Sequence, residues 1–201
     1  MTDEEARHKA KMVKRKALQD AEVAARPILS KGLLMVHTGP GKGKSTAAFG
    51  LAVRALGRGW RVGVVQFIKG AWATGERTAL ERFGDQIVWR VMGEGFTWET
   101  QDRERDIAAA RAGWEQALLL MADPSIGLLI LDELNVVLRY EYLPLADVVA
   151  ALRARRETLH VVVTGRNAKP ELIEAADLVT DMTAVKHHFA AGVRAQEGIE
   201  F

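Results

Sequence analysis

From residue 33 onward, short runs of apolar and β-branched residues alternate with stretches that repeat with helical period. The runs predict strands at residues 33–37, 61–67, 87–91, 128–131, 160–164 and 178–182. The stretches between them predict helices at residues 44–57, 74–83, 99–122, 145–156 and 170–176. In the longest of these, one helical face carries Ile107, Trp114, Leu118 and Met121. Near-continuous apolar strands separated by helices indicate an α/β protein with a mostly parallel central sheet that helices cover on both faces.

The first 26 residues have a different pattern. Residues 3–26 predict one charged helix, on which Leu18 and Val23 belong to a thin apolar stripe, and Pro27 ends it. A helix this polar seldom packs on a core by itself. Two interpretations stay open: a solvated tail, or an arm that docks on a partner subunit or closes over a site. We expect an N-terminal helical arm at residues 1–30 and one domain at residues 31–201.

Composition narrows the class of protein. A chain of 201 residues with 48% apolar residues is long enough for one domain with a substantial core. No run reaches the roughly 18 apolar residues of a membrane span, and the charged N-terminus does not resemble a secretion signal, so a cytoplasmic protein is expected. The absence of cysteine removes disulfides, iron–sulfur ligation and thiol catalysis. The net charge of +2 gives no reason to expect a nucleic acid partner.

A glycine-rich segment follows the first predicted strand and precedes the first predicted helix. It consists of Thr38, Gly39, Pro40, Gly41, Lys42, Gly43, Lys44, Ser45 and Thr46. This order predicts a P-loop, in which backbone N–H groups surround phosphate oxygens and the helix N-terminus adds its dipole. Lys44 is placed to reach phosphate oxygens, and the Ser45 hydroxyl to bind Mg²⁺. Thr38 stands where the strict motif has glycine, and the alternative is a glycine-rich turn with incidental lysines.

A pair of acids ends the fourth predicted strand. In P-loop proteins a carboxylate at this point holds Mg²⁺ directly or through water, which makes Asp132 and Glu133 candidate metal ligands. Glu133 is also a candidate general base, and an acidic helix cap is the alternative for both residues. The loop and the acids alone predict an ATPase or a kinase that cleaves the terminal phosphate. A nucleotide-binding regulator without catalytic activity is a further possibility.

Other polar residues end the predicted strands, where parallel sheets bind ligands. They are Gln66, Lys69, Asn135 and Arg166, of which Arg166 is a candidate anion contact and equally an ordinary surface arginine. The loop before the longest helix holds two aromatics, Phe96 and Trp98, that either face a ligand or pack on the domain. His187 and His188 are adjacent and therefore a poor metal site on their own.

Six segments together resemble a known family, the P-loop ATP:corrinoid adenosyltransferases of cobalamin synthesis and salvage. They lie at residues 38–50, 65–70, 95–101, 131–135, 164–166 and 192–201. The most specific are Gly-Phe-Thr-Trp-Glu-Thr-Gln at 95–101 and Gly-Val-Arg-Ala-Gln-Glu-Gly-Ile-Glu-Phe at the C-terminus. This sequence departs from the family at Pro40, where Asn or Asp is frequent, at Ser45, where Thr is usual, and at His188, where Pro is common.

The resemblance implies a RecA-like P-loop NTPase fold and a transfer reaction in place of phosphate cleavage. Such enzymes move the 5′-deoxyadenosyl group of ATP to the Co(I) centre of a reduced corrinoid and release triphosphate. By similarity, Lys44 stabilises the leaving triphosphate, and Ser45, Glu133 and Asp132 hold Mg²⁺ or Mn²⁺. Phe96 and Trp98 correspond to an aromatic pair that packs under the corrinoid and displaces its lower axial ligand.

The resemblance also implies partners. ATP is a co-substrate, and an external flavoprotein supplies electrons. The protein is expected to form a homodimer, and the N-terminal arm to cover the site across its interface.

Overall fold

The computed structural model describes residues 2–26, 31–68, 74–92 and 102–200 and divides into two compact units, Met1–Ser30 and Lys31–Phe201. The first unit holds one helix, α1 (Asp3–Ala24), which confirms the predicted charged helix. The Thr2 hydroxyl accepts from the Glu5 N–H, and the Glu5 carboxylate accepts from the Thr2 N–H, so a capping box begins the helix. No residue of α1 is buried. The roles assigned to the two units stay predictions.

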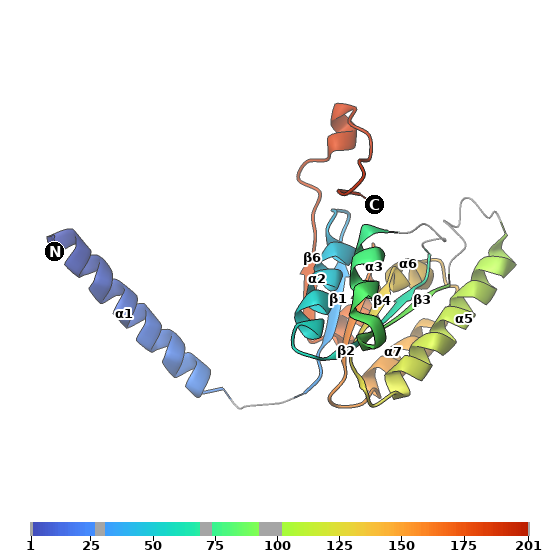
Figure 1. The fold of residues 1–201 in the computed structure, drawn as a ribbon, viewed down its shortest axis with the longest axis horizontal. Coiled ribbons are helices and arrows are strands. Elements are labelled where there is room, and N and C mark those ends of the chain that lie inside the picture. Colours follow the sequence, from blue (N-terminus) through green and yellow to red (C-terminus); the bar gives the residue numbers. More distant parts are fainter. Residues whose placement is uncertain (1, 27–30, 69–73, 93–101, 201) are drawn as a thin grey trace. The chain divides into compact units, whose positions relative to one another are not determined.

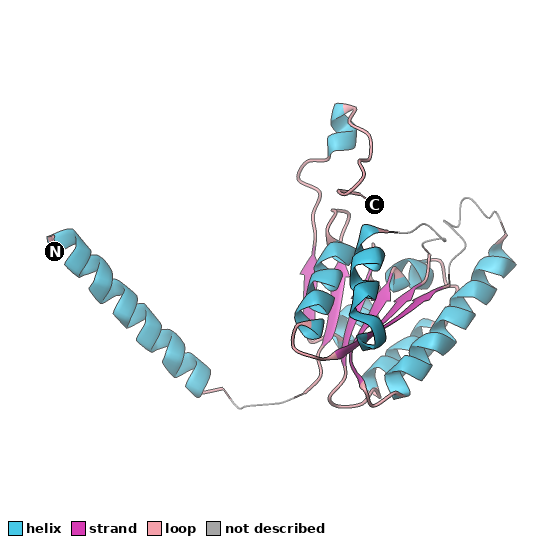
Figure 2. Ribbon diagram, in the orientation of Figure 1, coloured by secondary structure: helices cyan, strands magenta, loops and turns pink. Residues whose placement is uncertain are grey.

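Six parallel strands form the sheet of the second unit, in the order β3-β2-β4-β5-β1-β6 (Figures 1 and 2). They are β1 (Leu34–Thr38), β2 (Arg61–Gln66), β3 (Ile87–Val91), β4 (Ile126–Asp132), β5 (His160–Thr164) and β6 (Leu178–Asp181). The predicted α/β class and its parallel sheet are confirmed, and each predicted strand lies within two residues of an observed one. Because all six strands are parallel, their carboxyl ends share one edge.

The described helices of the second unit lie between successive strands, except η2, which follows β6. They are α2 (Lys44–Leu56), α3 (Gly75–Leu80), α5 (Arg103–Ala122), α6 (Leu134–Arg139), α7 (Leu145–Arg153) and α8 (Pro170–Ala175), with short 3₁₀ helices η1 (Glu81–Gln86) and η2 (His188–Ala191). The sequence did not predict α6, because six residues are too few to give a helical period. The predicted helix at 74–83 is divided between α3 and η1, and Gly84 (φ 55°) interrupts the latter.

Two hydrophobic cores lie on opposite faces of the sheet. In β4, Leu129 and Leu131 pack in the core formed with α5, α6, α7 and α8, whereas Leu128 and Ile130 pack in the core formed with α2 and Leu80 of α3. Successive side chains of a strand point to opposite faces, so a strand covered on both sides needs an apolar residue at every position. This explains the uninterrupted apolar runs and confirms that helices cover both faces.

The buried face of α5 agrees with the predicted one in part, because Met121 is buried and Trp114 packs against the core. Ala110, Ala117 and Leu120 are in the core beside Met121, while Leu118 is 40% exposed. The prediction followed the large apolar residues, but α5 lies close enough to the sheet that small side chains form much of its contact. Gly113 illustrates this, because a Cβ there would stand 3.0 Å from the Phe67 ring.

Candidate active site

Polar residues from five strands meet at the carboxyl edge of the sheet. β2 ends at Gln66, β4 at Asp132, β5 at Thr164, β1 at Thr38 and β6 at Asp181. All except Asp181 are less than 9% exposed, which is unusual for polar side chains. The strand order places β4, β5, β1 and β6 next to one another, so their end residues form one polar cluster beside the glycine-rich loop.

The loop packs against the chain that leaves β6. Gly39 (φ 98°) and Gly43 (φ 101°) have left-handed backbones that favour glycine. The Gly41 N–H donates to the Met182 carbonyl oxygen at 2.6 Å, and a Cβ on Gly41 would stand 2.6 Å from the carbonyl oxygens of Met182 and Thr183. The loop therefore needs glycine both for its turns and for this close backbone contact. A parallel α/β sheet with such a loop between β1 and α2 is the P-loop NTPase fold expected from the sequence.

Lys44 begins α2 and is buried, with 7% of its surface exposed. Its Nζ donates to the Gly41 carbonyl oxygen, which folds the side chain back over the loop. Burial lowers the pKa of Lys44, the nearby Glu133 carboxylate opposes this shift, and Arg166 and Lys42 reinforce it. A polyphosphate would favour the charged ammonium, because an opposite charge at short range raises the pKa of a lysine. Of the other predicted loop residues, Pro40, Lys42, Gly43 and Thr46 are exposed, and Ser45 is half-buried.

Asp132 is fully buried and accepts three side-chain hydrogen bonds. Its Oδ1 accepts from Ser45 Oγ and from Thr164 Oγ1, both at 2.7 Å, and its Oδ2 accepts from Gln66 Nε2 at 3.0 Å. The Trp89 Nε1–H donates in turn to Gln66 Oε1 at 2.9 Å. This network fixes the Ser45 hydroxyl relative to the sheet. Trp89 was missed in the sequence, because a tryptophan in an apolar strand is typical of a core residue.

Glu133 has a left-handed backbone (φ 64°), which is uncommon for a residue other than glycine. Its N–H donates to Thr164 Oγ1 at 3.0 Å, and its half-buried side chain lies beside Gly165, where a Cβ would be 3.2 Å from Glu133 Oε2. Glu133 stands at the N-cap position of α6, as the capping alternative expected, but its side chain makes no capping hydrogen bond to the helix. The negative charge of the Glu133 carboxylate raises the pKa of Lys44, against the effect of burial.

Oxygen donors suited to Mg²⁺ or Mn²⁺ converge here. The direct contact between Ser45 Oγ and Asp132 Oδ1 brings a hydroxyl and a carboxylate together, and Glu133 follows in the chain. Hydroxyl and carboxylate oxygens are ligands that hard divalent cations prefer, so these residues fit such an ion. No group of three or more His, Cys, Asp or Glu side chains with metal-site geometry occurs among the residues that the structure describes. A cation at this point would therefore also use phosphate and water oxygens.

The C-terminal segment reaches the loop through Glu200. This carboxylate forms an ion pair with Lys42 and lies 3.4 Å from His188 Nε2, and its side chain is only 9% exposed. Burial, and then the neighbouring groups His188, Lys42 and Arg166, lower the pKa of His187, so these groups are within electrostatic reach of one another. The sequence singled out the C-terminal run but assigned Glu200 no role. Asp181 was missed too, although its position at a strand end was a usable signal.

Three predicted contacts, Lys69, Phe96 and Trp98, lie outside the described residues. The proposed aromatic pair therefore stays a prediction.

Two family models match the chain. The model described as "ATP:corrinoid adenosyltransferase BtuR/CobO/CobP" matches residues 30–201, and the model described as "Cob(I)alamin adenosyltransferase N terminal" matches residues 1–23. The chain belongs to the ATP:corrinoid adenosyltransferase family. The resemblance seen in the sequence is thus confirmed, and the protein is a transferase that uses ATP and a corrinoid.

Three similar proteins match this chain over 93% or more of each sequence. The corrinoid adenosyltransferase of Pseudomonas aeruginosa is 55% identical over 99% of this chain and 98% of its own. That of Sinorhizobium sp. is 51% identical over 98% and 93% of the two chains, and that of Salmonella typhimurium 47% identical over both whole chains. In the described part of this adenosyltransferase, no helix combines the length and the apolar character that crossing a membrane requires.

Proposed function

We propose that this protein transfers the 5′-deoxyadenosyl group of ATP to the Co(I) centre of a reduced corrinoid and releases inorganic triphosphate. The observation that carries this proposal is the match of the adenosyltransferase model to residues 30–201, which include the entire phosphate loop and the acids of β4. The chain has no cysteine, and the reaction needs no side-chain nucleophile because Co(I) is the nucleophile.

The reaction balances as a nucleophilic displacement at the ribose 5′ carbon. An electron pair of Co(I) forms the cobalt–carbon bond, the bond from the 5′ carbon to the phosphate oxygen breaks, and its electron pair leaves with triphosphate. Cobalt becomes formally Co(III). The electrons that generate Co(I) come from an external donor, which we expect to be a flavoprotein. ATP must lie with its 5′ carbon exposed to the corrinoid, in the reverse of the usual sense for a P-loop.

Negative charge develops on the triphosphate as the carbon–oxygen bond breaks. The cationic and N–H groups of the loop would stabilise that charge. The ammonium of Lys44, released from the Gly41 carbonyl oxygen, and the backbone amides of the loop would donate to the leaving group. Ser45, Glu133 and Asp132 would hold Mg²⁺. When bound, the ion supplies Lewis-acid stabilisation of the phosphate oxygens. Asp132, which is fully buried and already accepts three side-chain hydrogen bonds, would act mainly by orienting Ser45.

The roles of the remaining parts of the site are inferred from the resemblance to the family. Phe96 and Trp98 would form the floor under the corrinoid and make cobalt four-coordinate, which eases its reduction. The arm at residues 1–30 would cover the site, in a homodimer across the subunit interface. We place the enzyme in the cytoplasm, in the formation or salvage of adenosylated corrinoids.

Product analysis tests the reaction. Purified protein, ATP, Mg²⁺ and chemically reduced corrinoid should yield an alkylcobalt absorbance spectrum and one triphosphate for each corrinoid adenosylated. Orthophosphate released without corrinoid, together with an unchanged corrinoid spectrum, would instead identify an ATPase.

Two substitutions separate the roles of the loop and the floor. Lys44→Ala should weaken ATP use whichever corrinoid is supplied, because the loop loses its buried cation. Trp98→Ala should leave the Kd for ATP near that of the unmodified protein and slow only the corrinoid step. Equal loss of both functions in Trp98→Ala would contradict the floor assignment.

A further inference from the structure

The chain that follows β6 folds back so that its end lies beside the phosphate loop (Figure 1). The helix η2 ends at Gly192, whose left-handed backbone (φ 75°) turns the chain. The N–H groups of Ile199 and Glu200 then donate to the Gln196 carbonyl oxygen at 3.2 Å and 2.9 Å. Residues 187–200, the C-terminal segment, therefore have hydrogen bonds of their own that present Glu200 to the loop.

The Glu200 carboxylate lies between two basic side chains. Its Oε2 pairs with the Lys42 ammonium of the phosphate loop, and its Oε1 is 3.4 Å from His188 Nε2. The Glu200 side chain is only 9% exposed, although most of the segment around it is exposed. A carboxylate that is largely removed from water is costly unless donors face it, so Lys42 and His188 together form a place that favours an anion.

Lys42 connects this anion to the nucleotide site. Burial is the main cause that lowers the pKa of Lys44 and the pKa of His187, and in both cases the charges of Lys42 and Arg166 add to the effect. Lys42 is therefore within electrostatic reach of the loop lysine on one side and of the C-terminal segment on the other. A ligand with several phosphates that is held at Lys44 would meet further basic groups beside it.

The C-terminal segment is held weakly enough for a ligand to displace it. Its apolar side chains Phe189 and Ile199 are 57% and 78% exposed, so they contribute little burial. Lys42 is half-exposed, and ion pairs of this kind contribute little to stability. Segments with few buried apolar contacts open at low cost. A polyphosphate has several negative charges against the single charge of Glu200, so it would displace the carboxylate from Lys42.

We propose that Lys42 and His188 form an anion subsite for an outer phosphate of the triphosphate group, and that Glu200 occupies this subsite until the ligand displaces it. The inference rests on the proposed function, because it takes the triphosphate of ATP as the ligand of the loop. An ammonium and an imidazole N–H donate to carboxylate and phosphate oxygens alike. Glu200 returns to these donors as triphosphate departs, so it also favours release of this product.

Hydrogen–deuterium exchange, followed by mass spectrometry, tests whether triphosphate displaces the segment. The full-length protein is compared without ligand and with inorganic triphosphate and Mg²⁺, at a concentration that protects the amides of residues 39–46. In the peptide that contains Ile199 and Glu200, exchange should become about twofold to fivefold faster with triphosphate, the factor for loss of one partly exposed ion pair. Unchanged or slower exchange there would overturn the proposal, because the segment would then stay in place or close over the ligand.

Glu200→Gln and Glu197→Gln are a matched pair of variants. Both remove one carboxylate from the same turn, but Glu197 is exposed and forms no ion pair within the described ranges. Glu200→Gln should exchange quickly at the C-terminus even without triphosphate and respond little to it. Glu197→Gln should exchange as the unmodified protein does, and an equal change in both variants would contradict the assignment of Glu200.

The contribution of His188 is measured where Glu200 no longer competes. His188→Ala in the Glu200→Gln background should raise the Kd for inorganic triphosphate about twofold to fivefold, because one donor to the phosphate is lost. An unchanged Kd would remove His188 from the subsite.

These measurements need no corrinoid, so they are separate from the transfer reaction. A protein that shows the triphosphate-dependent exchange but forms no alkylcobalt product would overturn the proposed function and leave the anion subsite standing. A protein that forms the alkylcobalt product without a change in C-terminal exchange would overturn the subsite alone.

Discussion

At the scale of single residues, buried polar groups link the loop to the sheet. Asp132 receives hydrogen bonds from three other elements, Ser45 of α2, Thr164 of β5 and Gln66 of β2. A fully buried carboxylate is costly unless it is hydrogen-bonded, and here all the donors come from side chains that end or begin elements at one edge. The position of the Ser45 hydroxyl therefore depends on the whole edge.

Glu200 opposes part of the positive charge at the loop through its ion pair with Lys42. Because Lys42 is about half-exposed, the effect is modest. We predict that Glu200→Gln binds inorganic triphosphate about twofold to fivefold more tightly, since a repulsive charge next to a polyanion site is removed. Isothermal titration calorimetry measures this, with Lys42→Gln as the comparison that should bind more weakly. Weaker binding by Glu200→Gln would mean that the pair positions Lys42 for the ligand.

His160 makes stability depend on pH. Its Nδ1 accepts from the Leu33 N–H at 3.2 Å, and its ring stacks on Trp60 at 5.3 Å. Burial and the Arg155 cation lower its pKa below the ordinary 6.5, so the fold favours neutral His160. The unfolded chain then binds more protons as the pH falls below 6.5 toward the folded pKa, and the free energy of unfolding decreases.

His160→Asn should retain an acceptor for the Leu33 N–H without titrating. Urea unfolding at about pH 7.5 and about pH 5.5 should therefore show a smaller loss of stability in the variant than in the unmodified protein. An equal loss in both proteins would assign the acid sensitivity to other groups.

At the scale of elements, the phosphate loop and the chain after β6 fit each other through backbone contacts at Gly41. We predict that Gly41→Ala destabilises the fold by about 1–3 kcal/mol, since its Cβ would overlap backbone atoms, and that it weakens ATP binding at least tenfold, about 1.4 kcal/mol. Chemical denaturation and ATP titration measure the two effects.

Gly50→Ala is the control for this substitution. Gly50 lies in α2, and a Cβ at this position would meet no atom of another element within 4 Å. Alanine there should stabilise the helix by about 0.5–1 kcal/mol. Normal ATP affinity in Gly41→Ala would contradict the tight fit.

At the scale of the whole molecule, both hydrophobic cores consist of residues of the second unit. Removal of residues 2–26 should therefore leave the free energy of unfolding of the remaining chain unchanged within about 0.5 kcal/mol. If the arm covers the site, adenosyl transfer falls in the shortened protein while the Kd for triphosphate stays the same. A lower stability would indicate that α1 packs on the domain.

Leu18→Ala/Val23→Ala in the full-length chain is a milder form of the same test. These side chains are 60% and 63% exposed, so their loss should not unfold α1. An arm that docks through its apolar stripe would lose transfer activity to the same extent as the shortened protein.

The sequence by itself determined the local features. Alternating runs and helical stretches defined the elements to within a few residues, because strands buried on both faces must be apolar throughout. The glycines and Lys44 of the loop were recognisable, because positive-φ turns favour glycine and because the P-loop motif has a lysine at this position. Two features were not predicted from the sequence. One is α6, whose six residues are too few to show a helical period, and the other is the part of the buried face of α5 where small residues take the place of Leu118.

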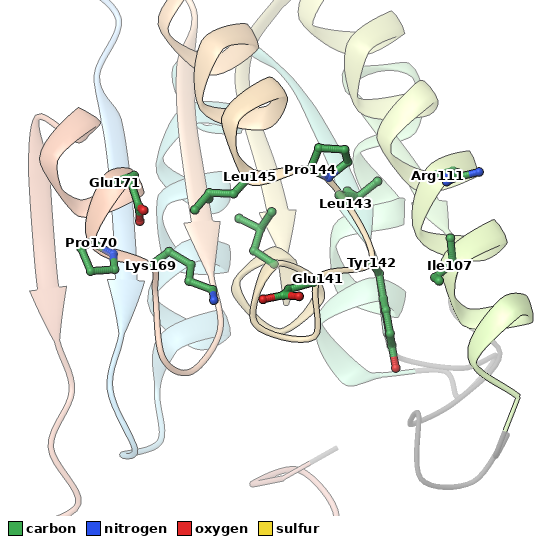
Figure 3. Close-up of a pocket in the computed structure, with 11 residues that line it drawn as sticks. Ile107, Arg111, Glu141, Tyr142, Leu143, Pro144, Leu145, Lys169, Pro170 and Glu171 are labelled. Carbon is green, nitrogen blue, oxygen red and sulfur yellow. The ribbon is translucent and has the colours of Figure 1, made fainter.

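Only the tertiary structure decided which distant residues act together. Ser45 and Asp132 are 87 positions apart in the chain and share a 2.7 Å hydrogen bond, because parallel strands end at one edge. Trp89 and Glu200 belong to the site through their contacts with Gln66 and Lys42, which no local sequence pattern predicts. A cavity beside the sheet likewise has walls from three separated segments, α5, the loop between α6 and α7, and the start of α8 (Figure 3). Backbone preference and burial determine which residue types follow one another in the sequence, so local patterns reveal them. The order of the strands depends on the packing of the whole chain, so no local pattern reveals it.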